Sequence, residues 1–191
     1  LQTGIADAEG NTATYTYDAD NDRLETAASG CSSTAYQYKD FGALEKITAA
    51  SGTEYGFTYD AFKNIKTICV GIRKLSENFY NPNNGPISYS IYGDGTKIGY
   101  RYDGQDRVTA RLYNDQEKVR YRYDKCGSLY EKQDLSTGIS YQYDYDLTGR
   151  VLGVAASDGT AYRYTFDQYN RISRLKSRNG NVTDTTEYLY G

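Results

Sequence analysis

One phrase recurs along this chain at a nearly constant interval. It reads YRYDGQDRV from Tyr100 and YRYDKCGSL from Tyr121, and related phrases stand before and after these two. Each copy is anchored on the second aromatic residue of an aromatic-x-aromatic pair or its equivalent, and successive anchors are 21 or 22 residues apart, except for a last interval of 24. The anchors are Tyr17, Tyr38, Tyr59, Tyr80, Tyr102, Tyr123, Tyr145, Phe166 and Tyr190. Such a period predicts a repeat protein in which each unit is one supersecondary element.

The residues around each anchor indicate what that element is. Before the anchor, aromatic and polar residues alternate, as Tyr121 and Tyr123 do with Arg120 and Arg122. A period of two is typical of a strand with one apolar face. Asp and then Gly or Asn follow the anchor, which favours a turn, and an aliphatic residue opens a returning strand. A second turn, such as SDGT at Ser157, closes the unit. Each unit is therefore predicted to be a β-hairpin.

The returning strand departs from a strict period of two. Its aliphatic residues are often three apart, as in Leu44 and Ile47 or Ile172 and Leu175. An ideal strand would place such a pair on opposite faces. A β-bulge directly after the turn would bring both residues to one face, and we predict a bulge there.

Successive hairpins are predicted to pair side by side, which gives an all-β fold with one long, curved or spiralling antiparallel sheet. The alternative, several short sheets packed as a sandwich, offers no reason for the constant spacing. No linker or charge run divides the chain. We expect a single domain over residues 1–191 with about eight to nine hairpin units of a larger protein. Open strand edges at its ends lead us to expect edge-to-edge self-association of the isolated fragment.

The composition agrees with a thin sheet that has little aliphatic core. Tyr occurs 23 times, beside five Phe and no Trp, Met or His. Tyr favours strands and tolerates water, because its ring is apolar and its hydroxyl is polar. The 22 basic and 25 acidic residues are mixed along the chain and give a net charge of −3, so we expect no nucleic-acid partner. No run approaches the roughly 18 apolar residues that a membrane span needs.

The anchor phrase resembles the YD repeat, whose ideal form is YDxxGR followed by an aliphatic residue. YDLTGRV at Tyr145 matches best, FDQYNRI at Phe166 and YDGQDRV at Tyr102 are close variants, and the resemblance extends from Tyr15 to Gly191. YD repeats define bacterial Rhs proteins, the C component of insecticidal toxin complexes, and animal teneurins. The resemblance implies a sheet that spirals into a hollow shell, of which this chain would be an open arc. In the bacterial toxins such a shell encloses a C-terminal effector domain, and in teneurins it belongs to an adhesive ectodomain.

The repeat positions are predicted to have structural roles. A row of carboxylates follows the anchors and could be read as calcium ligands or as glycosidase acids. Catalysis needs two placed carboxylates rather than a row, so we predict that each Asp caps its turn. Arg23, Arg107, Arg150 and Arg171 are predicted to pair with Asp or to stack on Tyr of neighbouring units. The structural positions are Tyr17, Asp18, Tyr38, Tyr59, Asp60, Tyr102, Asp103, Tyr123, Asp124, Gly127, Tyr145, Asp146, Gly149, Arg150, Phe166, Asp167 and Arg171.

No sequence feature predicts an enzyme. The chain has no His, no phosphate-binding loop, no serine elbow and no Cys-His pair. Cys31, Cys69 and Cys126 are too few and too widely spaced for a metal site or a disulfide framework. We therefore expect no catalytic activity, no cofactor and no metal.

Two functions from different classes stay open. The first is a structural part of a secreted or surface protein of a bacterium, which encloses or presents a toxin or effector domain and has flanking repeats and that C-terminal effector as partners. The second is an adhesion module whose tyrosine-rich face binds a glycan or a surface protein. Cross-strand pairing also explains the tyrosines, and the sequence assigns no ligand residues. The start, LQTGIADAEG, has neither a charged nor an apolar leader region, so we expect no signal peptide in this segment.

Overall fold

The computed structural model describes residues 1–82 and 85–190, and all regular secondary structure in these residues consists of β-strands. Residues 83, 84 and 191 lie outside this range, and with them part of the turn after Tyr80 and the last residue of the predicted repeat region, Gly191. By its internal contacts the chain divides into two compact units, Leu1–Lys97 and Ile98–Gly191. The single domain predicted from the sequence stays a prediction.

Nine strands belong to the first unit. They are β1 (Gly4–Ala6), β2 (Thr12–Tyr17), β3 (Leu24–Ser29), β4 (Ser32–Tyr38), β5 (Leu44–Thr48), β6 (Glu54–Tyr59), β7 (Ile65–Val70), β8 (Arg73–Tyr80) and β9 (Ile87–Tyr92). The second unit begins at Ile98, the second residue of β10. Its strands are β10 (Lys97–Tyr102), β11 (Val108–Tyr113), β12 (Gln116–Tyr123), β13 (Leu129–Asp134), β14 (Ser140–Tyr145), β15 (Val151–Ala156), β16 (Ala161–Phe166), β17 (Ile172–Asn179) and β18 (Val182–Glu187).

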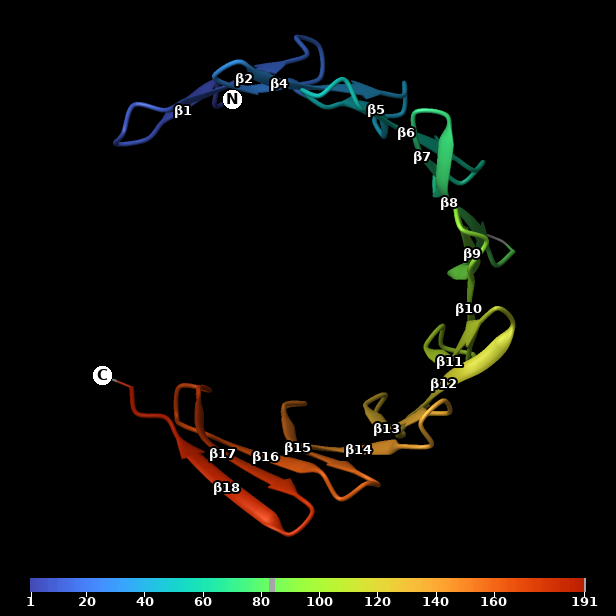
Figure 1. Cartoon of the computed structure of the whole chain (residues 1–191), viewed down its shortest axis with the longest axis vertical. Helices are drawn as coiled ribbons and strands as arrows, with labels where there is room; N and C mark the ends of the chain where they lie inside the picture. Colours follow the sequence, from blue (N-terminus) through green and yellow to red (C-terminus); the bar gives the residue numbers. More distant parts are fainter. Residues whose placement is uncertain (83–84, 191) are drawn as a thin grey trace. The chain divides into compact units, whose positions relative to one another are not determined.

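Within each unit, every strand pairs antiparallel with the strand that follows it in the sequence. Figure 1 shows the strands of each unit in a single layer. Among the described strands, substantial contacts within a unit join only neighbours in sequence, so no second sheet packs on the first. The predicted all-β fold of tandem hairpins is confirmed, and the sandwich alternative is wrong.

The turns after Tyr38, Tyr59, Tyr102, Tyr123, Tyr145 and Phe166 share one main-chain geometry, and the turn after Tyr17 is one residue longer. In the clearest copy, the Gly149 amide donates to the Asp146 carbonyl at 3.0 Å, and the Asp146 amide donates to the Arg150 carbonyl at 2.9 Å. This is the common hairpin loop in which a type I turn is followed by one left-handed residue. That residue is Gly149 here, with φ of 84°, and Gly or a short polar or charged residue in the other copies. The Gly, Asn or Asp of the repeat phrase therefore stands where the backbone needs a positive φ.

A β-bulge follows every one of these turns. In the second hairpin Tyr38 pairs with Leu44 and Tyr36 pairs with Ile47, which leaves Glu45 as an extra residue. Directly opposed residues share a face, so Leu44 and Ile47 lie together on the face of the two tyrosines. The same shift occurs beside the anchors Tyr17, Tyr59, Tyr80, Tyr102, Tyr123, Tyr145 and Phe166. The predicted bulge is confirmed.

Very little of the chain is buried. In the described part, only Ser90, Ile98, Gly99, Ala110 and Gly153 are buried. A single sheet leaves both of its faces open to water, so contacts between adjacent hairpins must supply most of the stability, as in other repeat proteins. The described residues include no helix that could cross a membrane.

The left-handed turn position predicts a difference between two glycine substitutions. A Cβ on Gly149 would meet nothing within 4 Å, so only its φ of 84° opposes Gly149→Ala. We expect this variant to lower the free energy of unfolding by about 1 kcal/mol. Gly104 lies in the equivalent loop with equal space but without a positive φ, so Gly104→Ala is the matched control and should be neutral or stabilising. Urea denaturation measures both, and equal losses would contradict the turn geometry.

Candidate functional site: the repeat seam

The anchor tyrosine joins each hairpin to the hairpin before it. Tyr145 Oη donates to the main-chain carbonyl of Leu129 at 2.8 Å, a residue of the preceding hairpin. The same bond joins Tyr38 to Leu24, Tyr59 to Leu44, Tyr80 to Ile65, Tyr123 to Val108 and Tyr190 to Ile172. Partial burial raises the pKa of Tyr145 above its ordinary value, so its hydroxyl stays a neutral donor. The repeat is therefore held by a side-chain bond as well as by the strand ladder.

The accepting carbonyl is one that the strand ladder does not reach. Leu129 opens β13, but the pairing of β13 with the next hairpin begins only at Glu131 and Gln142. A main-chain carbonyl without a partner is costly in a folded chain. The hydroxyl of Tyr145 supplies the missing donor, which explains why Tyr rather than Phe dominates the anchor position.

The aspartate after each anchor caps its own turn. Asp146 Oδ1 accepts the amides of Thr148 at 2.8 Å and Arg150 at 3.0 Å. The carboxylates of Asp60, Asp103, Asp124 and Asp167 accept the amides two and four residues ahead in the same way, and Asp18 accepts those two and three residues ahead. This is the local side-chain bonding that makes Asp a turn residue. The carboxylates of this row serve the backbone of their own loops.

Hydrogen bonds hold several of these carboxylates in the ionised form. The Thr148 hydroxyl lowers the pKa of Asp146 most, and the Arg150 amide and guanidinium lower it further. For Asp103 and Asp167, partial desolvation works in the opposite direction, but the turn amides and the neighbouring Arg outweigh it, and the pKa of each is lowered. A general acid needs a raised pKa, so these three carboxylates are poorly suited to that role.

The arginine that ends the turn connects its aspartate to the next hairpin. Arg150 Nε donates to Asp146 Oδ2 at 2.6 Å, and the guanidinium lies 4.6 Å from the ring centre of Phe166. Phe166 is the anchor of the following hairpin. The same stacking joins Arg23 to Tyr38, Arg107 to Tyr123 and Arg171 to Tyr190. Arg107 and Arg171 make both of the contacts that the sequence offered as alternatives: each binds the aspartate of its own turn, Asp103 or Asp167, and stacks on the anchor tyrosine of the next hairpin.

The turn glycine has a second role that the sequence did not indicate. A Cβ built on Gly42 would lie 2.9 Å from Nη2 of Arg23, and one on Gly127 would lie 3.5 Å from Nη1 of Arg107. The arginine of one hairpin therefore passes over the turn glycine of the next. We call this row of tyrosine, aspartate, arginine and turn-glycine positions the repeat seam.

The two faces of the sheet differ in chemistry. The anchors and the returning aliphatic residues share one face, the tyrosine face, on which Tyr92, Tyr113 and Tyr162 are 45%, 46% and 43% exposed. The opposite, polar face carries cross-strand pairs such as the ion pair of Arg122 with Glu131 at 2.8 Å. The hydroxyls of Thr16 and Thr26, and of Thr58 and Thr67, also meet across strands there.

The three cysteines form no disulfide. Cys31, Cys69 and Cys126 are free thiols. Over residues 1–82 and 85–190, no group of three or more His, Cys, Asp or Glu side chains is placed to hold a metal ion.

The tyrosine bond predicts opposite effects of two exchanges between Tyr and Phe. Tyr145→Phe leaves the Leu129 carbonyl without a donor and should lower the free energy of unfolding by about 1 kcal/mol. Phe166→Tyr is the matched control, because the repeat places the Val151 carbonyl where a new hydroxyl would reach it. This second variant should gain stability. Urea denaturation compares the two, and a loss in both would show that the hydroxyl does not join the hairpins.

The aspartates of the seam predict an acid-sensitive fold. A lowered folded-state pKa contributes stability that is fully present above the unfolded value of about 3.9 and is lost as the pH falls toward the folded value. The free energy of unfolding should therefore fall below about pH 4. Asp146→Asn keeps the shape of the side chain and removes one such charge. The free energy of unfolding of this variant should therefore depend less on pH in this range. A pH series of urea denaturation curves with the same slope for both proteins would contradict this.

Comparison with known structures finds a similar fold in parts of toxin complexes. No family model and no curated protein matches the sequence. The crystal structures of TcdB2-TccC3-Cdc42 and of TcdB2-TccC3 each match 95% of this chain at 13% identity, with TM-scores of 0.72 and 0.71. A Photorhabdus luminescens Tc holotoxin pore matches 93% at 13% identity, with a TM-score of 0.68.

This chain spans 11% or 12% of the chains that it matches in these structures. At such identity the likeness concerns the fold. It agrees with the repeat phrase, and the chain resembles the YD-repeat proteins of toxin complexes in its fold as well as in its sequence pattern.

Proposed function

We propose that this chain is a structural YD-repeat segment of a larger bacterial protein that is secreted or displayed at the surface. It forms part of a β-shell that encloses or presents another domain, such as a toxin effector. The observation that carries the proposal is the repeat seam, in which most anchors donate a tyrosine hydroxyl to the preceding hairpin and four turns stack an arginine on the anchor of the next one. The fold shared with Tc toxin complexes over 95% of the chain supports it.

A single-layer sheet suits the wall of a container. It covers a large area with few residues, because no second layer is needed behind it. Its contacts run from hairpin to hairpin, so the wall extends by adding repeats and needs no central core. The partners in this proposal are the flanking repeats of the same polypeptide and a C-terminal effector. The role is not enzymatic, in keeping with seam aspartates whose oxygens are occupied by turn amides.

The alternative function is an adhesion module that binds a glycan or a surface protein through the tyrosine face. The exposed rings of Tyr92, Tyr113 and Tyr162 favour it, because aromatic faces with a polar tip suit recognition surfaces. The anchor hydroxyls are engaged in the seam, so contacts to a ligand would come from these other tyrosines. This reading needs no enclosed domain.

Limited proteolysis of the intact native protein, followed by mass spectrometry, distinguishes the two functions. Under the shell proposal, a discrete C-terminal piece survives protease until denaturant unfolds the repeats, and it is then digested rapidly. The control is the same protein exposed to protease after unfolding and dilution. If all flanking segments are digested at once and only the repeats resist, the shell proposal is wrong and the tyrosine face becomes the site to examine.

A further inference from the structure

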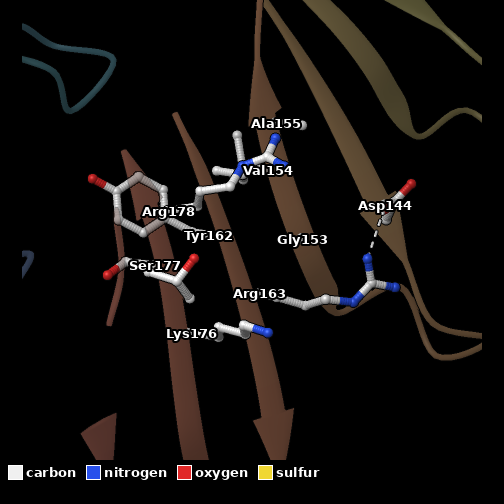
Figure 2. Close-up of a pocket in the computed structure, with 11 residues that line it drawn as sticks. Asp144, Gly153, Val154, Ala155, Tyr162, Arg163, Lys176, Ser177 and Arg178 are labelled. Carbon is white, nitrogen blue, oxygen red and sulfur yellow. Dashed lines mark ion pairs between the residues drawn. The ribbon is translucent and has the colours of Figure 1, made fainter. Parts of the chain in front are cut away.

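A shallow hollow lies on the polar face of the second unit, over β14 to β17 (Figure 2). Its volume is about 460 Å³. The floor is made by Gly153, Ala155 and Ala161, which carry no side chain or a single methyl group. The cationic side chains on its rim are those of Arg163, Lys176 and Arg178. Strand register places these six residues on one face, and we call the site the basic hollow.

Two of the rim cations oppose each other directly. Arg163 on β16 pairs with Lys176 on β17, and like charges in that position destabilise a sheet. Among directly opposed residues in the described strand pairs within the two units, these are the only two with charges of the same sign. On the same face, Arg174 of β17 instead lies opposite Glu187 of β18 and pairs with it at 2.7 Å. An unfavourable pairing of like charges that occurs at only one place in the described strand pairs points to a functional site.

The rim charges are only partly neutralised by the protein. Asp144 is the one acidic residue that lines the hollow, and its Oδ2 lies 3.8 Å from Nη1 of Arg163, with both side chains more than two-thirds exposed. Arg178 Nε donates to the carbonyl of Gly159 at 3.3 Å, which orients the guanidinium without removing its charge. Three cations against one carboxylate leave a local excess of two positive charges, in a chain whose net charge is −3.

We propose that the basic hollow binds an acidic peptide segment in an extended conformation, with carboxylates at alternate residues. Lys176 and Arg178 are two residues apart on one strand, a separation of about 6.8 Å, and alternate side chains of an extended peptide have the same spacing. The floor without long side chains lets a peptide backbone approach the sheet. The planar guanidinium of Arg163 can hold a carboxylate through two parallel hydrogen bonds.

The single carboxylate on the rim favours a peptide over a uniformly charged polymer. Asp144 stands beside Arg163 at one border of the hollow in Figure 2. A sulfated glycan that extended across this border would bring its negative groups against Asp144. A peptide can place an uncharged residue there. The inference goes beyond the proposed function, because the site is complete within one unit and needs no enclosed domain.

Fluorescence anisotropy with a labelled peptide tests the proposal on the full chain. The probe has Glu at every second position, and the control peptide has the same composition with Glu three residues apart, which points alternate carboxylates to opposite faces of an extended chain. The alternate peptide should bind at least about tenfold more tightly at low salt, a difference of about 1.4 kcal/mol. Affinity should fall as salt is raised, because the contacts are between exposed charges.

Protein variants locate the binding. Lys176→Gln together with Arg178→Gln should weaken the alternate peptide at least about tenfold, by about 1.4 kcal/mol. The control is Arg122→Gln, which removes the same type of charge from the same face at a paired position and should leave binding unchanged. Lys176→Gln alone should not lower the midpoint of urea unfolding, because it relieves the repulsion with Arg163, and this separates lost binding from lost folding.

Three results would overturn the proposal. The first is no binding of the alternate peptide, and the second is equal loss of affinity in the Arg122 control. The third is tighter binding of a heparin-derived oligosaccharide through Lys176 and Arg178, which would assign the hollow to a glycan.

Discussion

This architecture depends on one constraint: a main-chain carbonyl in the repeated hairpin receives no main-chain hydrogen bond from the adjacent strand. The bulge after each turn brings the aliphatic residues to one face, and the ladder to the next hairpin starts only two residues later. The carbonyl of the first returning residue then needs another donor. A tyrosine hydroxyl from the next hairpin reaches it, at 2.8 Å between Tyr145 and Leu129. The bulge and the anchor tyrosine are thus parts of one solution, and the bond forms although the two residues are 14 to 18 positions apart in different repeats.

The thinness of the sheet follows from the same arrangement. Ordinary domains gain stability from an apolar core, but here only five residues, two of them glycines, are buried in the described part of the chain. Charged and aromatic groups at the surface replace that core: Arg150 touches both its own Asp146 and the ring of Phe166 in the next hairpin. Contacts of this kind are weak singly, and they add up because they recur in register. The cost is that the seam depends on ionised carboxylates, which a buried core does not.

Much of the fold could be predicted from the sequence, because the residue types that favour strands, turns and bulges recur at fixed positions of the repeat. The constant spacing predicted the hairpins, Leu44 and Ile47 predicted the bulge, and the arginines predicted the Asp pairs and the stacking. The tyrosine bond to Leu129 was not predicted, since no pattern shows which carbonyl a bulge leaves free. The basic hollow was also missed. Arg163 and Lys176 are 13 residues apart in sequence, and only the strand register makes them opposite neighbours.

The strands are joined by two rows of turns, one at each end of the strands, and the two rows differ in how closely side chains contact them. In the row of the repeat seam, Tyr, Arg or Gly of several turns contacts a neighbouring hairpin. In the other row, a Cβ added to Gly30, Gly71 or Gly180 would meet nothing within 4 Å. Loops of two residues and longer loops both occur in that row. Longer loops and inserted segments should therefore be tolerated in this second row of turns during evolution, while the turns of the repeat seam maintain the register of the hairpins.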